Sequence, residues 1–228
     1  MSLEIFSVIF WVFAIVSTYL QDKASTGEKK VVSLTTLIKI IPALSAVIFV
    51  MLFRPPTLFT ILLAAAFAFC MFGDVGMEVD LIPGIGMFLI AHILYTINFL
   101  WHISTIGFDI LQAVIAVVCM LIMVLYVFML IRYLRASGPE VPPFILKAGT
   151  LYFLLISATL SSSLLLWLTS NVIFGALSVF GALIFIVSDS LIAINEFRQE
   201  ITHHEFYIMP TYYLAIFLLS LGVFVFAF

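Results

Sequence analysis

The chain has 228 residues, of which 65% are hydrophobic and only 9% are charged, and its formal net charge is −3. Soluble domains carry about 25% charged residues, so this composition excludes a water-soluble globular protein and indicates an integral membrane protein. Nucleic acid is excluded as a partner, because its binding needs a basic surface. The cysteines, Cys70 and Cys119, both lie in apolar runs, which is typical of small buried side chains and not of a disulfide framework.

Apolar runs of about 20 residues, the length that crosses a bilayer as a helix, follow one another along the chain. They predict an all-α integral membrane bundle of eight transmembrane helices in a single domain, residues 1–228. The predicted helices are 3–20, 34–52, 57–77, 81–101, 107–134, 142–168, 171–197 and 205–227. The first run lacks the basic start and cleavage site of a secretory signal, so we expect it to be retained as the first helix.

The basic residues predict how the bundle is oriented. With eight helices both termini share one side, whose loops hold only Arg54, whereas the other side collects most of the remaining Lys and Arg. These are Lys23, Lys29, Lys30, Arg132, Arg135 and Arg198. The positive-inside rule therefore predicts both termini outside the cytoplasm. A bacterial cytoplasmic membrane and the endoplasmic reticulum both fit.

Two carboxylates, Asp74 and Asp189, interrupt apolar runs. At the helical rise per residue, Asp74 lies about 6 Å from Glu78 and Asp189 about 10 Å from Glu196, both in the cytoplasmic half of the bilayer. Ionisable residues at this depth are costly and usually face the bundle interior. We therefore expect the two acids to share one functional site. The alternative is a structural role in which each acid pairs with a lysine to lock helices together.

Lys39 and Lys147 each lie about two turns into a helix that begins on the cytoplasmic side. The tripeptides LIK and ILK end at these lysines, as FGD and VSD end at the two acids. Two parallel four-helix repeats would explain this pattern and would bring both lysines and both acids to one cavity. Each lysine has two readings, phosphate binding or extension of its long side chain to the interface.

His92 lies near mid-membrane, with Tyr95 on the same helix face one turn later. A buried, hydrogen-bonded core histidine is the alternative to a functional one. The pair His203 and His204 beside Glu205 lacks the spacing of a helical metal site such as H-E-x-x-H, so no metal is expected. The residues alone fit hydrolysis by acid–base catalysis and equally fit a proton-coupled carrier of small solutes or lipids. A lipid-binding protein without catalysis is a third reading.

Five blocks of the sequence resemble those of the YhhN-type lysoplasmalogenases, which are eight-helix membrane hydrolases. The blocks are LIKIIP (37–42), FGD (72–74), GIGMFLIAHILYTINF (84–99), ALIFIVSDSLIAINEF (182–197) and TYYLA (211–215). They stand in the same order across nearly the whole chain. One departure is Ile216, where the family pattern has a Gln.

The resemblance implies cleavage of the vinyl ether bond of lysoplasmalogens, giving a fatty aldehyde and glycerophospho-choline or -ethanolamine. Such a bond hydrolyses by protonation at carbon, followed by attack of water on the oxocarbenium ion. Two carboxylates in different environments can divide these roles, as in glycosidases. We expect the deeper Asp189 to be the general acid, because burial favours its neutral form. Asp74 would stay ionised and orient the water; the opposite assignment stays open.

The resemblance also assigns roles to residues around the acids. The expected partner is a lysophospholipid in the bilayer, with its headgroup at the cytoplasmic mouth and its chain toward mid-membrane. A homo-oligomer is compatible with the sequence, and the mechanism requires no cofactor. Residues expected to orient the acids or bind substrate are His92, Tyr95, Asn195, Tyr212 and Tyr213, with Lys39 and Lys147 at the phosphate.

Overall fold

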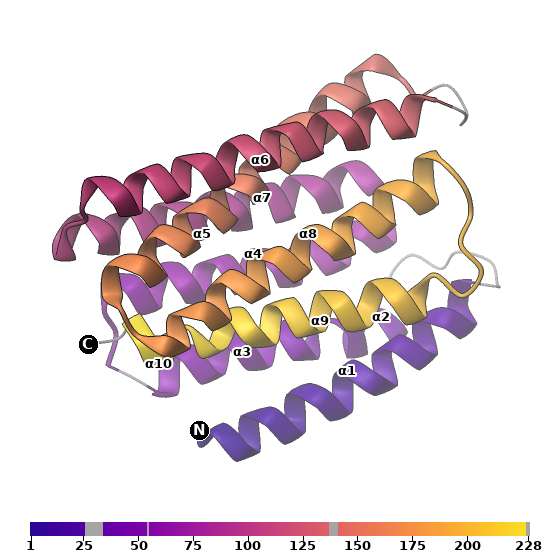
Figure 1. Ribbon diagram of the computed structural model, residues 1–228. Coiled ribbons are helices and arrows are strands. Elements are labelled where there is room, and N and C mark those ends of the chain that lie inside the picture. Colours follow the sequence, from indigo (N-terminus) through magenta and orange to yellow (C-terminus); the bar gives the residue numbers. More distant parts are fainter. Residues whose placement is uncertain (26–33, 54, 137–140, 227–228) are drawn as a thin grey trace.

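The computed structural model describes residues 1–25, 34–53, 55–136 and 141–226, which form a bundle of long helices running back and forth along one axis (Figure 1). In these residues, seven helical segments are long and apolar enough to cross a membrane, and α9 is a shorter apolar helix. The all-α membrane fold is confirmed, whereas the count of eight crossings stays a prediction. The helices are α1 (Leu3–Ser25), α2 (Leu34–Lys39), α3 (Ile41–Phe53), α4 (Leu58–Val79), α5 (Leu81–Ile106), α6 (Ile110–Arg135), α7 (Pro143–Ser170), the 3-10 turn η1 (Ile173–Gly175), α8 (Ala176–Phe197), α9 (Glu205–Leu221) and α10 (Val223–Phe226).

Short polar residues lie at the ends of several of these helices and define where the helices begin or stop. The side chain of Thr57 accepts a hydrogen bond from the backbone N–H of Thr60 at the start of α4, and Asp80 does the same for Ile82 in α5. Such caps satisfy backbone groups that a helix end leaves unpaired. Asn171 ends α7 in the left-handed conformation (φ 53°), which asparagine adopts more readily than most residues. The helix therefore ends at the last residue of the weakly polar tetrapeptide LTSN (168–171).

The second predicted helix is interrupted at Ile40, two residues before Pro42. α2 ends at Lys39 and α3 begins at Ile41, because proline has no N–H with which to continue the helical hydrogen bonds. The hydroxyl of Tyr213 on α9 lies 3.3 Å from the carbonyl oxygen of Lys39 and 2.8 Å from Oγ of Ser17 on α1. Tyr213 thus connects the interruption to α1 and α9.

Sequential helices pack as neighbours in most of the bundle. α4 packs against α5, α6 against α7, and α8 against α9, while α1 covers α3 and α9. The α4–α5 contact is close enough that a Cβ added to Gly76 would lie 2.8 Å from the backbone of Gly84. α6 lies on the outside of the bundle, and most of its apolar side chains are exposed, as expected of a helix that faces lipid.

One end of the bundle carries most of the polar connections. The end of α1, the α4–α5 turn and the α8–α9 loop lie at this end, whereas the start of α1 and α10 lie at the opposite end, which we call the terminal end (Figure 1). We call the end with the polar connections the loop end. Lys23, Arg132, Arg135 and Arg198 belong to it. Lys29, Lys30 and Arg54, on which the predicted orientation also depends, lie outside the described residues, so the orientation stays a prediction.

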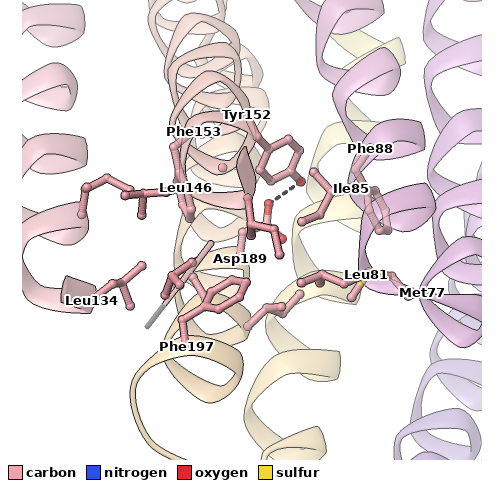
Figure 2. Close-up of a pocket in the computed structure, with 16 residues that line it drawn as sticks. Met77, Leu81, Ile85, Phe88, Leu134, Leu146, Tyr152, Phe153, Asp189 and Phe197 are labelled. Atoms are coloured by element: carbon pink, nitrogen blue, oxygen red, sulfur yellow. Dashed lines mark hydrogen bonds between the residues drawn. The ribbon is translucent and has the colours of Figure 1, made fainter. Parts of the chain in front are cut away.

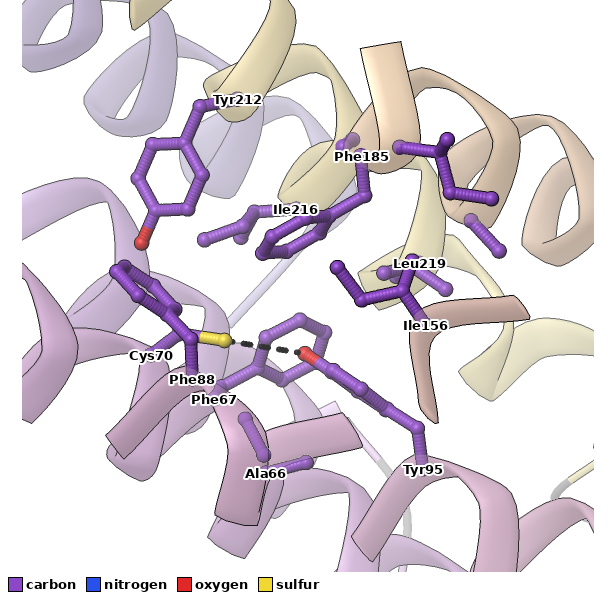
Figure 3. Packing of buried hydrophobic residues seen from close by; sticks show 14 of the residues in the cluster. Ala66, Phe67, Cys70, Phe88, Tyr95, Ile156, Phe185, Tyr212, Ile216 and Leu219 are labelled. Atoms are coloured by element: carbon purple, nitrogen blue, oxygen red, sulfur yellow. Dashed lines mark hydrogen bonds between the residues drawn. The ribbon is translucent and has the colours of Figure 1, made fainter. Parts of the chain in front are cut away.

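Buried aromatic rings fill the middle of the bundle and its terminal end. Phe67, Tyr95 and Phe185, from three helices, are fully buried in the middle layer (Figure 3). Nearer the terminal end, Phe6 stacks on Phe49 with ring centroids 4.2 Å apart. The packed rings leave the loop end as the place where polar side chains gather.

Candidate active site

Acidic side chains from three helices line one cavity at the loop end. Asp74 of α4, Asp189 of α8 and Glu205 of α9 line it, together with Lys39 from the end of α2. This polar cavity has a volume of about 560 Å³, its open mouth included. The structure thus brings the two intramembrane acids together, while their catalytic role stays a prediction.

The helices present these residues through regular spacing. On α9 the lining residues are Glu205, Ile208, Met209 and Tyr212, at intervals of three and four. Residues at such intervals occupy one face of a helix. α8 repeats the pattern from Asp189 through Ile192 to Glu196, so one stripe on each helix forms the wall of the polar cavity.

Each aspartate accepts a hydrogen bond from a tyrosine. The hydroxyl of Tyr212 donates to Oδ2 of Asp74 at 2.9 Å. The hydroxyl of Tyr152 donates to Oδ2 of Asp189 at 2.7 Å (Figure 2). All four residues are buried, so each carboxyl group is held in one orientation with its second oxygen available to a substrate or to water.

The electrostatic surroundings of the two aspartates differ. Nζ of Lys39 lies 2.8 Å from Oε1 of Glu78, and the same ammonium group interacts electrostatically with Asp74 and Glu205. Asp74 therefore lies in a network of charges. Asp189 instead faces Tyr152 and a wall of apolar side chains, so the two carboxyl groups have the unequal environments that a division of acid and base roles requires.

A second, apolar cavity meets the first at Asp189. It has a volume of about 630 Å³, its open mouth included, and side chains of α4 to α8 line it (Figure 2). The residues common to both cavities are Met77, Phe88, Asp189 and Ile192. The apolar cavity lies beside the polar one, along the ends of these helices. Rings such as Phe185 fill the middle of the bundle, and the expected chain site toward mid-membrane stays a prediction.

Asn195 and Tyr212 are two further predicted site residues that line the polar cavity. Oδ1 of Asn195 accepts a hydrogen bond from the backbone N–H of Ile201 at 2.9 Å, so this side chain also fixes the start of the α8–α9 loop. Tyr213 faces the other way, toward Lys39 and Ser17. It braces the wall of the cavity without lining it.

His92 and Tyr95 lie beneath the two cavities and line neither. Nδ1 of His92 is 3.2 Å from Oγ1 of Thr159, and its Nε2 is buried without a hydrogen-bond partner among the described residues. The hydroxyl of Tyr95 lies 3.7 Å from Sγ of Cys70 (Figure 3). The structure therefore places both residues in the packed layer that supports the site from below.

Lys147 is not brought to either cavity. Its side chain is exposed on α7, in contrast to the buried Lys39, so the structure does not arrange the two lysines as an equivalent pair. Of the two roles expected for Lys147, extension of the side chain to the membrane interface fits this position.

Sequence patterns do not indicate that several further residues line the cavities. Tyr152 lies in the predicted helix 142–168, where none of the five family blocks falls, and the sequence pattern around His204 and Glu205 bears only on metal binding. A signal for Glu205 exists, because it precedes Tyr212 by seven residues and so shares its helix face. In the described part of the chain, no three His, Cys, Asp or Glu side chains form a cluster that would hold a metal ion.

Comparison with known proteins identifies related sequences. The sequence model of the YhhN family matches residues 34–223. Human lysoplasmalogenase TMEM86B is 28% identical over 188 residues, which are 82% of this chain and 74% of the human protein. No solved structure was found to match the chain.

Proposed function

Because the chain belongs to the YhhN family, we propose that it is a lysoplasmalogenase, which hydrolyses the vinyl ether bond of 1-alkenyl lysophospholipids. The related human protein carries this activity in its name. The observation that carries the proposal is the position of Asp189, where the polar cavity meets the apolar one. A lysoplasmalogen has the same division, since its vinyl ether lies between a hydrocarbon chain and a polar headgroup.

In the proposed reaction, Asp189 donates its proton to the vinyl carbon that is not bonded to oxygen. Its apolar surroundings favour the neutral acid. The other vinyl carbon becomes an oxocarbenium ion, which the ionised Asp74 stabilises from the network around Lys39. Asp74 then takes a proton from the attacking water. As the hemiacetal collapses, Asp74 returns its proton to the departing glycerol oxygen and Asp189 takes the proton of the hemiacetal hydroxyl, which restores both groups. The products are a fatty aldehyde and glycerophospho-choline or -ethanolamine, so that one water is consumed and one carbon–oxygen bond is broken.

The headgroup would occupy the polar cavity. Lys39 lines this cavity together with the two acids and would attract the phosphate. Carboxylates at the mouth, Glu196 and Glu205, would offset the positive charge of a choline or ethanolamine group. Under the predicted orientation this mouth opens to the cytoplasm.

The rival reading, a proton-coupled carrier, requires a path across the bundle. The fully buried rings of Phe67, Tyr95 and Phe185 lie between the cavities and the terminal end. A carrier would have to move these rings on every cycle, whereas a hydrolase with both substrate and product on one side would not. The layer therefore favours the hydrolase.

The test is aldehyde release from lysoplasmenyl-ethanolamine and lysoplasmenyl-choline by the purified protein. We expect release by the wild type and its loss in folded Asp74→Asn and Asp189→Asn variants. Asp109→Asn is the matched control, because Asp109 caps the exposed start of α6, where asparagine caps equally well. A folded wild type that releases no aldehyde from either lipid would refute the proposed activity. Full activity in either cavity variant would refute the mechanism.

A further inference from the structure

Gly149 has no packing or backbone reason to be a glycine. It lies in the interior of α7, where glycine costs about 1 kcal/mol relative to alanine. Several other helical glycines permit close contacts: a Cβ at Gly73 would lie 2.8 Å from the ring of Phe88, and one at Gly181 would lie 2.9 Å from Leu219, whereas the exposed Gly86 resembles Gly149 in its open surroundings but lines neither cavity. A Cβ at Gly149 would meet nothing within 4 Å, and its φ is not positive. The absence of a side chain at position 149 therefore leaves open space beside α7.

The open space beside Gly149 is the apolar cavity. Gly149 lines this cavity between Ile145 and Tyr152, which precede and follow it by about one turn on the same face of α7. Tyr152 donates the hydrogen bond to Asp189. A side chain at position 149 would thus enter the cavity about 4.5 Å along the helix axis from the partner of the reacting acid.

We propose that Gly149 keeps the apolar cavity wide enough for the hydrocarbon chain of the lipid substrate, and so determines which chain lengths the protein accepts. The inference rests on the proposed function. The cavity is lined almost entirely by apolar side chains, and it continues into the polar cavity through Asp189 and Phe88. A ligand that places its reactive bond at Asp189 and its headgroup in the polar cavity has its chain at the entrance of the apolar one.

The expected effect of filling the cavity depends on chain length. Gly149→Leu adds four carbon atoms and would displace about three methylene groups of a bound chain. Burial of each methylene group contributes about fourfold to affinity. The loss for a long alkenyl chain is therefore roughly 60-fold in kcat/KM, since three such factors multiply. A chain too short to reach position 149 would lose almost nothing.

The experiment compares aldehyde release from lysoplasmenyl-ethanolamines with long and with short alkenyl chains by the wild type, Gly149→Ala and Gly149→Leu. Gly86→Leu is the matched control, because Gly86 is an exposed helical glycine that also has nothing within 4 Å of a Cβ and lines neither cavity. We expect a graded loss for the long chain alone, and no selectivity change in Gly86→Leu. Equal losses for both chains, or full retention of the long one, would overturn the inference.

A binding measurement separates this inference from the proposed activity. The probe is a 1-alkyl lysophosphatidylethanolamine, which has no vinyl ether to cleave, with a photoreactive diazirine near the end of its chain. We expect it to label residues 141–153 in the wild type and to lose this labelling in Gly149→Leu. If the wild type releases no aldehyde but shows this pattern, the activity fails and the chain site stands. Labelling that is confined to residues outside the lining of the apolar cavity, or unchanged in Gly149→Leu, would refute the chain site.

Discussion

Lys39 interacts with several acids of the polar cavity, and we expect its replacement to lower the free energy of unfolding. Its Nζ lies 2.8 Å from Glu78, and the exposed fractions of the two side chains are only 9% and 19%. At this distance the Coulomb attraction is roughly 6 kcal/mol for an effective dielectric constant of about 20. The free energy of removing both ions from water offsets much of this attraction. The measurable quantity is therefore the loss in free energy of unfolding when one partner is replaced.

Replacing Lys39 should cost more than replacing Glu78. Lys39→Met leaves Glu78, Asp74 and Glu205 near one another without their shared cation, and removal of one partner of a buried pair costs about 3–5 kcal/mol. We expect about 3 kcal/mol, the low end, because Glu78 retains access to water. Glu78→Gln should cost only about 1 kcal/mol, because Lys39 still interacts with Asp74 and Glu205.

The assay is the free energy of unfolding, measured by SDS titration in mixed micelles for the wild type, both single variants and the double variant. The double variant should lose less than the sum of the two single losses, since residues in one ion-pair network are not additive. If Glu78→Gln costs as much as Lys39→Met, the pair is isolated and the network around Lys39 does not stabilise the fold. Additive losses would show that the two side chains do not interact.

Three further predictions concern other parts of the bundle. Tyr152→Phe and Tyr212→Phe each remove a hydrogen bond to one aspartate, and the kcat/KM of aldehyde release should fall about 10- to 100-fold; unchanged rates would show that these bonds do not position the acids. Gly76→Ala forces a methyl group against the backbone of Gly84 and should lower the free energy of unfolding by about 1–3 kcal/mol, as judged by SDS titration. Asn171→Ala should cost about 1 kcal/mol in the same titration, because alanine disfavours the left-handed conformation, whereas Asn171→Gly should be nearly neutral.

Hydropathy predicts the helices of this chain well because lipid requires every backbone group of a crossing segment to be paired within it. Helix ends follow different rules. The predicted helix 81–101 stops where polar residues begin, but α5 continues to Ile106, since helical hydrogen bonding does not depend on hydrophobic side chains. Similarly, the stop after α7 depends on the backbone conformation of Asn171 and not on the polarity of its neighbours.

The two aspartates of the site could be predicted from the sequence, because a carboxyl group within a membrane span is energetically costly and usually has a function. Tyr152 and Gly149 could not be predicted in this way, because neither residue is energetically costly in a membrane helix. Their importance depends on how α7 is rotated in the bundle. The same rotation places Lys147 outside: residues two positions apart point to nearly opposite sides of a helix, so the wall that presents Gly149 to the cavity turns Lys147 away from it. A local repeat of three residues carries no information on this rotation.

The bracing of Lys39 by Tyr213 has a consequence for the order in which the protein is made. The two residues are 174 positions apart, and Tyr213 and Ser17 are 196 apart. While the ribosome is still synthesising the middle of the chain, the interruption before Pro42 lacks this partner, although polar backbone groups exposed to lipid are costly. The wall that carries Lys39 can close only when α9 has entered the membrane. A nascent chain that stalls before α9 therefore has no finished polar cavity, and the proposed reaction requires that α9 has been made and inserted.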